Sequence, residues 1–192
     1  MKKVLIIGAS GSLAKYVINE LQSDTEVHLT LFLRSKKRLS GIDSNGFDIV
    51  EGDVMDYPTL KDAINGQDIV YVNLAGNLEA MAKNIVKAMQ ETGVKRVIAI
   101  SSIGIYETPL RSVLQPYRKL ADVIEASGLE YTILRPAWFT SANEVDYEIT
   151  RKGEPERGSI ISKRSLATFI TEIIETPAKY IRENLGINKP GP

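Results

Sequence analysis

The chain has 192 residues, of which 43% are hydrophobic, an amount that suits one domain with a full core. Lys plus Arg and Asp plus Glu both number 24, so the formal net charge is zero and the chain lacks the positive field on which nucleic-acid binding depends. It has no cysteine and one histidine, His28, which excludes disulfides, thiolate catalysis and a zinc site of the usual Cys/His kind.

The lengths of the apolar segments indicate where the protein is located. Residues 4–7 form an apolar run that is too short for a signal peptide and breaks at Gly8. No later segment has the apolar length needed to span a bilayer. We therefore expect a cytoplasmic protein with no metal, no nucleic-acid partner and no membrane partner.

Short strands alternate with amphipathic helices along the chain, which is the pattern of a parallel sheet covered by helices on both faces. The expected strands are residues 3–8, 27–33, 47–51, 69–72, 96–101, 131–134 and 183–188. Apolar residues at helical spacing predict helices around residues 13–21, 60–64, 78–90, 117–127 and 166–174. The methionines of the third helix, Met81 and Met89, are expected in the core, and Ser162 is the expected N-cap of the last helix.

Residues 8–14, GASGSLA, are the most informative stretch because they follow the first expected strand and open a helix. Gly8 and Gly11 allow a sharp turn and a close approach of the backbone to a ligand, and the free N–H groups at a helix start attract an anion. Such a turn is typical of a dinucleotide-binding fold, in which it holds the pyrophosphate. The alternative is an ordinary glycine turn. With the alternating elements, this turn predicts a single-domain, Rossmann-like doubly wound parallel sheet over residues 1–192, with a small C-terminal substrate or lid region after about residue 140.

The residues after the second strand indicate which cofactor is bound. An acid there hydrogen-bonds the ribose 2′-hydroxyl of NAD, whereas an arginine accommodates the 2′-phosphate of NADP. Here the strand is followed by RSKKR, in which Arg34 has the fork geometry for a phosphate and Ser35, Lys37 or Arg38 complete the clamp. We therefore predict NADP(H) in preference to NAD(H). The alternative is a solvated basic loop.

Candidate ligand-binding residues also follow the later strands, at the edge where such sheets bind ligands. After the third strand, Asp53 is suited to accept a hydrogen bond from adenine, and equally to cap a helix. After the sixth strand, Trp138 and Phe139 follow a predicted turn at Arg135 and Pro136. Their aromatic faces suit stacking on a flat substrate, with a core or lid role as the alternative.

The order of these motifs resembles the short-chain dehydrogenase/reductase superfamily, and more closely its atypical, NmrA-like NAD(P)H-binding branch. The resemblance covers residues 3–139 and is most specific in Gly8-x-x-Gly11-x-x-Ala14, SSIG at 101–104 and SGLEYTILRP at 127–136. It implies a pyrophosphate along Gly8, Ser10, Gly11, Ser12 and Leu13, a 2′-phosphate at Arg34, adenine at Asp53 and Val54, the adjoining ribose at Leu74, Ala75 and Gly76, and the nicotinamide near Ser101, Ser102, Pro136 and Ala137.

The Tyr-x-x-x-Lys pair of the standard family members is missing from this chain. Tyr117 lies at a suitable distance after Ser102 to be a candidate acid, but Ala121 stands four residues later. Lys119 is two residues from Tyr117, so the two side chains lie about 200° apart on a helix. The catalytic candidates are therefore Ser102 and Tyr117. An equal alternative is that Tyr117 and Lys119 have no catalytic role and occupy ordinary positions on a half-exposed helix.

Two functions from different classes are consistent with these features. One is NADPH-dependent reduction of a small planar acceptor such as a flavin, a quinone or a tetrapyrrole, as the resemblance to flavin and biliverdin reductases implies. The other is a non-catalytic NADP(H) sensor whose ligand-bound surface is recognised by a regulated protein partner, as in NmrA-like regulators. We expect a monomer or a homodimer, paired in the latter case through the helices at 78–90 and 117–127.

Overall fold

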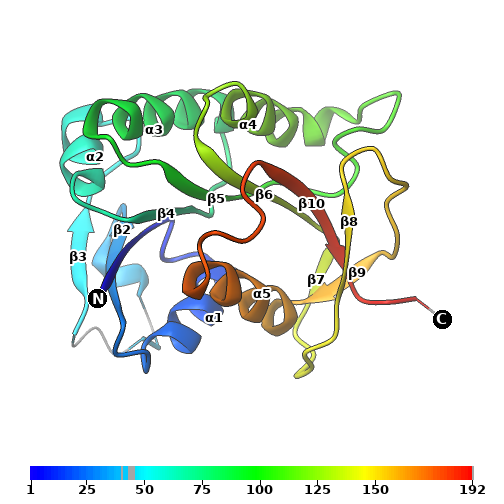
Figure 1. Ribbon diagram of the computed structural model, residues 1–192, viewed down its shortest axis with the longest axis horizontal. Helices are drawn as coiled ribbons and strands as arrows, with labels where there is room; N and C mark the ends of the chain where they lie inside the picture. The colour runs from blue at the N-terminus through cyan, green and yellow to red at the C-terminus, as the bar shows by residue number, and fades with distance from the viewer. Residues whose placement is uncertain (40, 43–45, 192) are drawn as a thin grey trace.

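The computed structural model describes residues 1–39, 41–42 and 46–191, and an eight-stranded sheet forms its centre (Figure 1). The strand order is β3-β2-β1-β4-β5-β6-β10-β8, and every neighbouring pair is parallel except β10 with β8. The strands are β1 (Lys2–Ile7), β2 (Val27–Leu33), β3 (Asp48–Glu51), β4 (Ile69–Val72), β5 (Arg96–Ile100), β6 (Glu130–Pro136), β8 (Glu148–Arg151) and β10 (Glu183–Asn188). A second, two-stranded sheet pairs β7 (Trp138–Thr140) with β9 (Ile160–Ser162).

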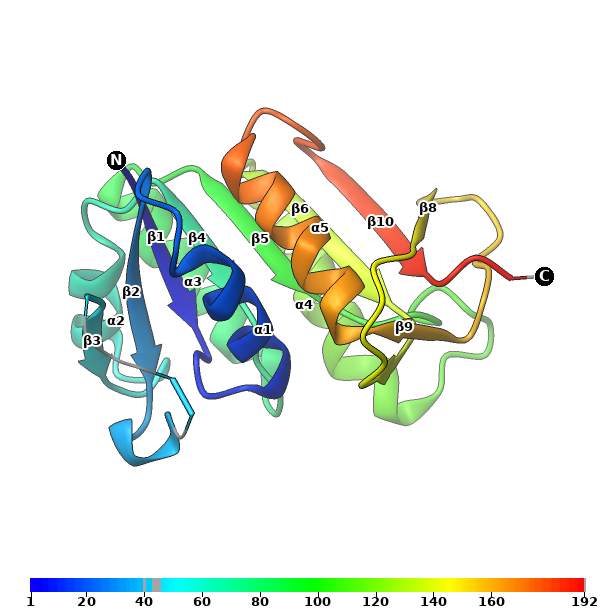
Figure 2. The same cartoon turned by 90° about the horizontal axis from the view of Figure 1, so that it is seen from below.

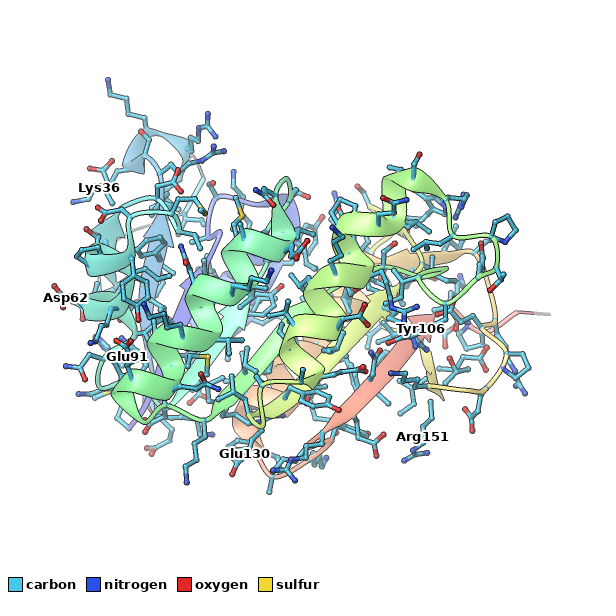
Figure 3. All side chains as sticks on the ribbon, turned by 90° about the horizontal axis from the view of Figure 1, so that it is seen from above. Lys36, Asp62, Glu91, Tyr106, Glu130 and Arg151 are labelled. Carbon is cyan, nitrogen blue, oxygen red and sulfur yellow. The ribbon has the colours of Figure 1, made fainter. Side chains whose placement is uncertain are left out.

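Helices cover both faces of the central sheet (Figures 1 and 2). One face carries α1 (Ser12–Leu21) and α5 (Lys163–Glu175), which pack against each other. The other carries α2 (Tyr57–Ile64), α3 (Leu78–Thr92) and α4 (Gln115–Glu125), and Figure 3 shows α3 and α4 side by side there. Two short 3-10 helices, η1 (Lys36–Arg38) and η2 (Ser112–Leu114), stand in connections. The predicted doubly wound α/β fold is confirmed.

The core consists of two apolar layers separated by the sheet. Residues 4–7 of β1 are fully buried, and they alternate between the layers: Val4 and Ile6 belong to the cluster under α1 and α5, Leu5 and Ile7 to the cluster under α2, α3 and α4. Because a parallel strand buries both of its faces, it appears in the sequence as an uninterrupted apolar run. The central strands were predictable for this reason.

Several predicted boundaries are confirmed and others differ. Ser162 is the N-cap of α5, and its hydroxyl accepts a hydrogen bond from the Ser165 N–H at 2.9 Å. The turn predicted at Arg135 and Pro136 is wrong, because both residues belong to β6. The short strands β7, β8 and β9 were not predicted; runs of three or four residues show too little alternation to be distinguished from a loop.

The region after residue 140 is built into the domain. β10 pairs with β6 and extends the central sheet, β8 pairs with β10, and α5 lies beside α1. Figure 2 shows α5 crossing the sheet next to α1, with β9 at its end. The C-terminal residues therefore complete the sheet, with β10 ending at the same edge as β6 and β8 running in the opposite direction.

Gly8 is the tightest backbone position of the sheet edge and gives a test of the fold. It has φ +86°, and a Cβ there would lie 2.1 Å from the backbone oxygen of Asn73. Gly93, after α3, has φ +76° but open space around it. We expect Gly93→Ala to lower the free energy of unfolding by about 1–2 kcal/mol, and Gly8→Ala by roughly 1–3 kcal/mol more because its Cβ overlaps backbone.

Urea unfolding of the parent and the two variants measures the difference. Both substitutions carry the same penalty for a left-handed backbone, so the comparison isolates the contact with Asn73. Equal free energies of unfolding for the two variants would contradict the close approach of the β1 turn to the end of β4.

Candidate functional site

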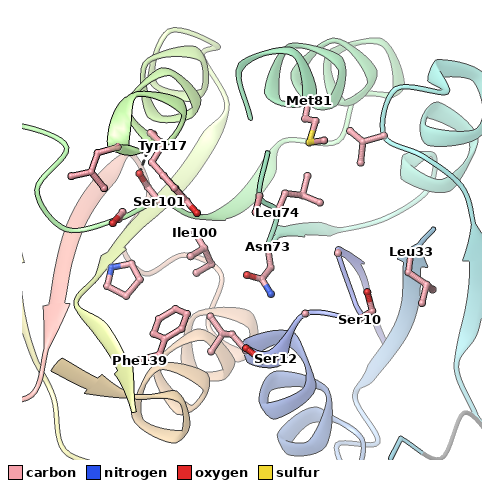
Figure 4. Close-up of a pocket in the computed structure, with 18 of the residues that line it drawn as sticks. Ser10, Ser12, Leu33, Asn73, Leu74, Met81, Ile100, Ser101, Tyr117 and Phe139 are labelled. Atoms are coloured by element: carbon pink, nitrogen blue, oxygen red, sulfur yellow. Dashed lines mark hydrogen bonds between the residues drawn. The ribbon is translucent and has the colours of Figure 1, made fainter. Parts of the chain in front are cut away.

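A cleft of about 620 Å³ runs along the carboxyl edge of the sheet (Figure 4). Its centre lies where β1 and β4 are neighbours, the point at which the strand order reverses direction. Open α/β sheets bind ligands at this kind of switch point. The cleft is lined by residues from the ends of β1, β2, β4, β5 and β6, by the start of α1, and by the η2 and α4 region.

The glycine turn leaves the start of α1 open to the cleft. Gly8, Ser10, Gly11, Ser12 and Leu13 all line the cleft. The α1 helix starts at Ser12 with no side-chain cap and no acid in its first turn. Its unpaired N–H groups and the positive end of its dipole favour an anion. The turn therefore has the features of a pyrophosphate site.

Gly11 gives direct evidence of a cradle that a side chain would fill. Its backbone is ordinary, with φ −66° and ψ 149°, so conformation does not require a glycine. A Cβ there would lie 2.7 Å from the Asn73 side-chain nitrogen and 3.2 Å from the Gly8 carbonyl oxygen. The absence of a side chain keeps the backbone accessible to a ligand.

The basic end of the cleft contains Arg34, directly after β2. Arg34 is exposed, lines the cleft beside Leu33 and Asp53, and forms no ion pair with another described residue. Ser35 and Lys37 lie outside the cleft lining; Ser35 precedes η1, and Lys37 is exposed within it. Of the basic residues in 34–38, Arg34 is therefore the one that lines the cleft.

Asp53 and its neighbours follow β3 on the same side. Asp53 lines the cleft, and its Oδ1 accepts a hydrogen bond from the Met55 N–H at 2.9 Å. The alternative role of Asp53 as a helix cap is wrong, since Asp56 occupies the N-cap position of α2. Val54 is buried and lines the cleft as well.

The end of β4 and the start of α3 form the middle of the cleft wall. Leu74 and Ala75 line the cleft, whereas Gly76, which the sequence places with them, lies outside the lining. Met81 of α3 is half-buried and faces the cleft (Figure 4), but it also packs against the core cluster under α2, α3 and α4, so its expected place in the core is confirmed in part. Met89 is fully buried, as expected.

The opposite end of the cleft contains the catalytic candidates. Ser102 lines the cleft, and its hydroxyl donates to the Ile103 carbonyl at 3.1 Å. Ser101 is buried, and its hydroxyl donates to the Tyr117 carbonyl at 3.1 Å, which ties the end of β5 to α4. Figure 4 shows the Tyr117 ring reaching from α4 into the cleft. Pro136 and Ala137 line the same end.

Lys119 lies outside the cleft lining. Its ammonium contacts the Glu79 carboxylate of α3 at 2.7 Å, and its side chain is 58% exposed. Hydrogen bonds from Lys119 and Lys83 hold the pKa of Glu79 at about 2. Tyr117 and Lys119 therefore face different surroundings, as their spacing on a helix requires.

Trp138 and Phe139 form an exposed aromatic rim. They line the cleft, and their exposed fractions are 72% and 41%. A core role for either residue is therefore wrong. Trp138 pairs in register with Ile160 of β9, which holds the rim on a short strand.

Other cleft residues were not among the predicted site residues, and these are Phe32, Leu33, Gly52, Asn73, Met81, Ile100, Ile103, Arg111, Val113 and Leu114. Gly52, Asn73 and Ile103 belong to stretches after strands, at the edge where the sequence indicates ligand binding, but they were given no role of their own. Arg111 and Val113 come from the connection before α4, which carries no motif.

Within residues 1–39, 41–42 and 46–191, no group of three His, Cys, Asp or Glu side chains is placed to hold a metal ion. In the same residues, the structure contains no helix of the length and hydropathy needed to cross a membrane.

Comparisons with known proteins agree with this geometry. A family model described as NAD(P)H-binding matches residues 8–177. A Rossmann-fold NAD(P)-binding family protein from Shigella flexneri has 47% sequence identity and a TM-score of 0.92, over 100% of this chain and 95% of that one. A wide-type short-chain dehydrogenases/reductase from Veillonella parvula, solved in complex with NADP, has 27% identity and a TM-score of 0.88, over 99% and 95% of the two chains.

A plant relative extends the comparison. An isoflavone reductase homolog from Nicotiana tabacum, A622-like, is 28% identical over 151 residues, which cover 71% of this chain and 48% of that protein. The chain thus spans about half the length of this relative. With the family match over most of its length and the Rossmann sheet around an open glycine turn, the chain belongs to the NAD(P)H-binding family, in the atypical, NmrA-like group of the short-chain dehydrogenases/reductases.

Proposed function

We propose that this protein uses NADPH to reduce a small planar acceptor, such as a flavin, a quinone or a tetrapyrrole, without a Tyr-Lys relay. The observation that carries this proposal is that the two ends of one continuous cleft offer different chemical groups. One end has an open helix start and Arg34, and the other has Tyr117 and an exposed aromatic rim but no lysine among its described lining residues.

In this proposal the cofactor lies along the carboxyl edge of the sheet and supplies a hydride when bound. The solved Veillonella relative contains NADP, which supports the choice of ligand. The proposed contacts are Gly8, Ser10, Gly11, Ser12 and Leu13 for the pyrophosphate, Arg34 with Ser35 and Lys37 for the 2′-phosphate, Asp53 and Val54 for adenine, Leu74, Ala75 and Gly76 for the adjoining ribose, and Ser101, Pro136 and Ala137 for the nicotinamide.

The acceptor would lie between the nicotinamide end and the aromatic rim. Trp138 and Phe139 offer flat apolar surfaces, and the region after residue 140 holds them through the pairing of β7 with β9. Tyr117 and Ser102 are the hydroxyl groups positioned to contact an acceptor. A conjugated planar acceptor takes a hydride readily and obtains its proton from water, so it depends less on a positioned acid than a ketone does.

A sensor of NADP(H) is the second candidate, and one observation favours it. Lys119 is held by Glu79 outside the cleft lining, so the lysine of the standard catalytic pair has no counterpart among the described lining residues. A bound cofactor would then act by changing the surface that a regulated protein partner recognises. Failure to oxidise NADPH with any acceptor would favour this candidate.

The first prediction concerns cofactor preference. Arg34→Ala should weaken NADP(H) binding roughly tenfold or more, because charge-assisted hydrogen bonds contribute about 1.5–3 kcal/mol. NAD(H) lacks the 2′-phosphate, so its affinity should change little. Titration calorimetry with both cofactors measures this, and Lys95→Ala, exposed at the opposite edge of the sheet, is the control for loss of one positive charge. Equal affinities of the parent for NADP(H) and NAD(H) would contradict the preference.

The second prediction concerns the cradle at Gly11. Gly11→Val should abolish NADP(H) binding while the protein stays folded, because the backbone there suits valine and the shortest contact of its Cβ is with the end of the Asn73 side chain, ahead of the Gly8 carbonyl oxygen at 3.2 Å. Circular dichroism and calorimetry measure folding and binding. Gly11→Val in an Asn73→Ala background removes the clash with the Asn73 side chain and controls for instability that arises from it. Normal NADP(H) binding by a folded Gly11→Val protein would show that the turn is only structural.

The third prediction concerns the acceptor and the missing relay. Because Lys119 contacts Glu79 and not the cleft, Lys119→Ala should retain activity with a flavin or quinone to within about threefold. Simple alcohols and ketones should be poor substrates, since general acid–base catalysis normally contributes 10²–10⁴-fold to their reactions. Steady-state assays of the parent, Tyr117→Phe and Lys119→Ala with one substrate of each class test this. Alcohol oxidation that falls about a thousandfold in both variants would contradict it.

A further inference from the structure

The connection between β8 and β9 is exposed except for one acid. From residue 151 to residue 160, Glu156 is the single residue that is not exposed to solvent. Its side chain is only 19% exposed. An acid that points inward from an exposed loop loses hydration, so it needs specific partners that stabilise its charge.

The Glu156 carboxylate has two partners from different strand ends. One oxygen, Oε1, lies 2.9 Å from Nε of Arg135, and the other, Oε2, accepts a hydrogen bond from the Gly104 N–H at 2.7 Å. Arg135 belongs to β6 and is 1% exposed, whereas Gly104 lies in the loop after β5. A single side chain thus bridges the β5 loop and β6 from behind the cleft.

Both partners are adjacent to residues that line the nicotinamide end of the cleft. Gly104 follows Ser102 and Ile103, and Arg135 precedes Pro136 and Ala137. The two segments also bond to each other directly, through the Ile103 N–H and the Pro136 carbonyl at 3.1 Å. A change in the Glu156 contacts would therefore move this wall of the cleft and leave the glycine turn in place.

Arg135 has weaker partners apart from Glu156. Its Nη1 donates to Asn184 Oδ1 of β10 at 3.3 Å, and its guanidinium lies 5.2 Å from the centroid of the Tyr106 ring. Asn184 in turn donates to the Tyr106 hydroxyl at 2.8 Å. None of these is a carboxylate bound to Arg135, so loss of Glu156 would leave a buried cation without its ion-pair partner.

We propose that Glu156 is a positioning residue that holds the loop of residues 101–104 and the end of β6 in place at the nicotinamide and acceptor end of the cleft. This inference rests on the proposed function for its effect on turnover, but its structural part is independent of any acceptor. In this role the exposed loop after β8 affects the site through one buried carboxylate without touching a ligand.

Hydrogen exchange followed by mass spectrometry tests the positioning directly. In Glu156→Ala the amides of residues 101–106 should exchange about tenfold faster or more, because the hydrogen bond to Gly104 and the ion pair to Arg135 are both lost. In Glu156→Gln the amide oxygen still accepts from Gly104, so the increase should be smaller. Exchange in residues 8–14 should match the parent.

A matched control lies in the same loop. The exposed Glu154 accepts only within its own turn, from the Arg151 N–H at 2.7 Å, so Glu154→Ala should leave exchange in residues 101–106 unchanged. Parent-like exchange in Glu156→Ala, or an increase spread equally over all strands, would overturn the proposal. The first result would remove the bridge, and the second would make Glu156 a contributor to global stability only.

Ligand measurements separate this proposal from the proposed function. NADPH affinity of Glu156→Ala should stay within about threefold of the parent, since the anion-binding turn and Arg34 are at the other end. The KM for the acceptor should rise about fivefold or more, and Glu156→Gln should recover part of it. If the parent reduces no acceptor, the proposed reductase function fails while the exchange data still decide the role of Glu156. An unchanged KM with altered exchange would overturn the effect on the site.

Discussion

The close approach of the β1 turn to the end of β4 is the constraint on which the ligand cleft depends. The Asn73 N–H donates to the Ile7 carbonyl at 3.0 Å, which extends the pairing of the two strands to their ends. Gly8 then turns away with a backbone that only glycine adopts easily, directly over the Asn73 carbonyl. Because β1 and β4 separate beyond this point, α1 begins beside an open space and its first N–H groups face the cleft.

One end of the cleft is formed mainly by backbone and the other mainly by side chains. The end proposed for the pyrophosphate consists of backbone and small side chains, whose position follows from the sheet and from Gly8 and Gly11. The end proposed for the acceptor consists of side chains from the β5 loop, α4 and β7, which are set by contacts between distant parts of the chain. Rigid elements fix backbone donors better than they fix side chains on loops, so the sheet itself holds the first end, whereas the proposed role of Glu156 is to connect the β5 loop with β6 at the second.

This difference also explains what the sequence predicts. Buried parallel strands are visible as apolar runs, the glycine turn as a local pattern, and the divergence of Tyr117 and Lys119 as helix geometry. In contrast, β7 and β9 are too short to show alternation, and Trp138 was placed after a turn that does not exist. Glu156 has no local signal, because its partners lie 21 and 52 residues earlier in the chain. The sequence around it resembles any solvated loop.

The two ends of the cleft are formed by different parts of the chain, so the residues around the acceptor can change independently of the glycine turn. The end proposed for the adenine and pyrophosphate is formed by the ends of the first four strands, and the wall proposed for the nicotinamide and acceptor by residues that follow β5 and β6. Changes at Trp138, Val113 or the β8–β9 connection would alter the shape and polarity around the acceptor without touching the glycine turn. The proposed reaction uses no lysine from the described lining residues, so orientation of the acceptor against the cofactor would be the main contribution of the protein to it.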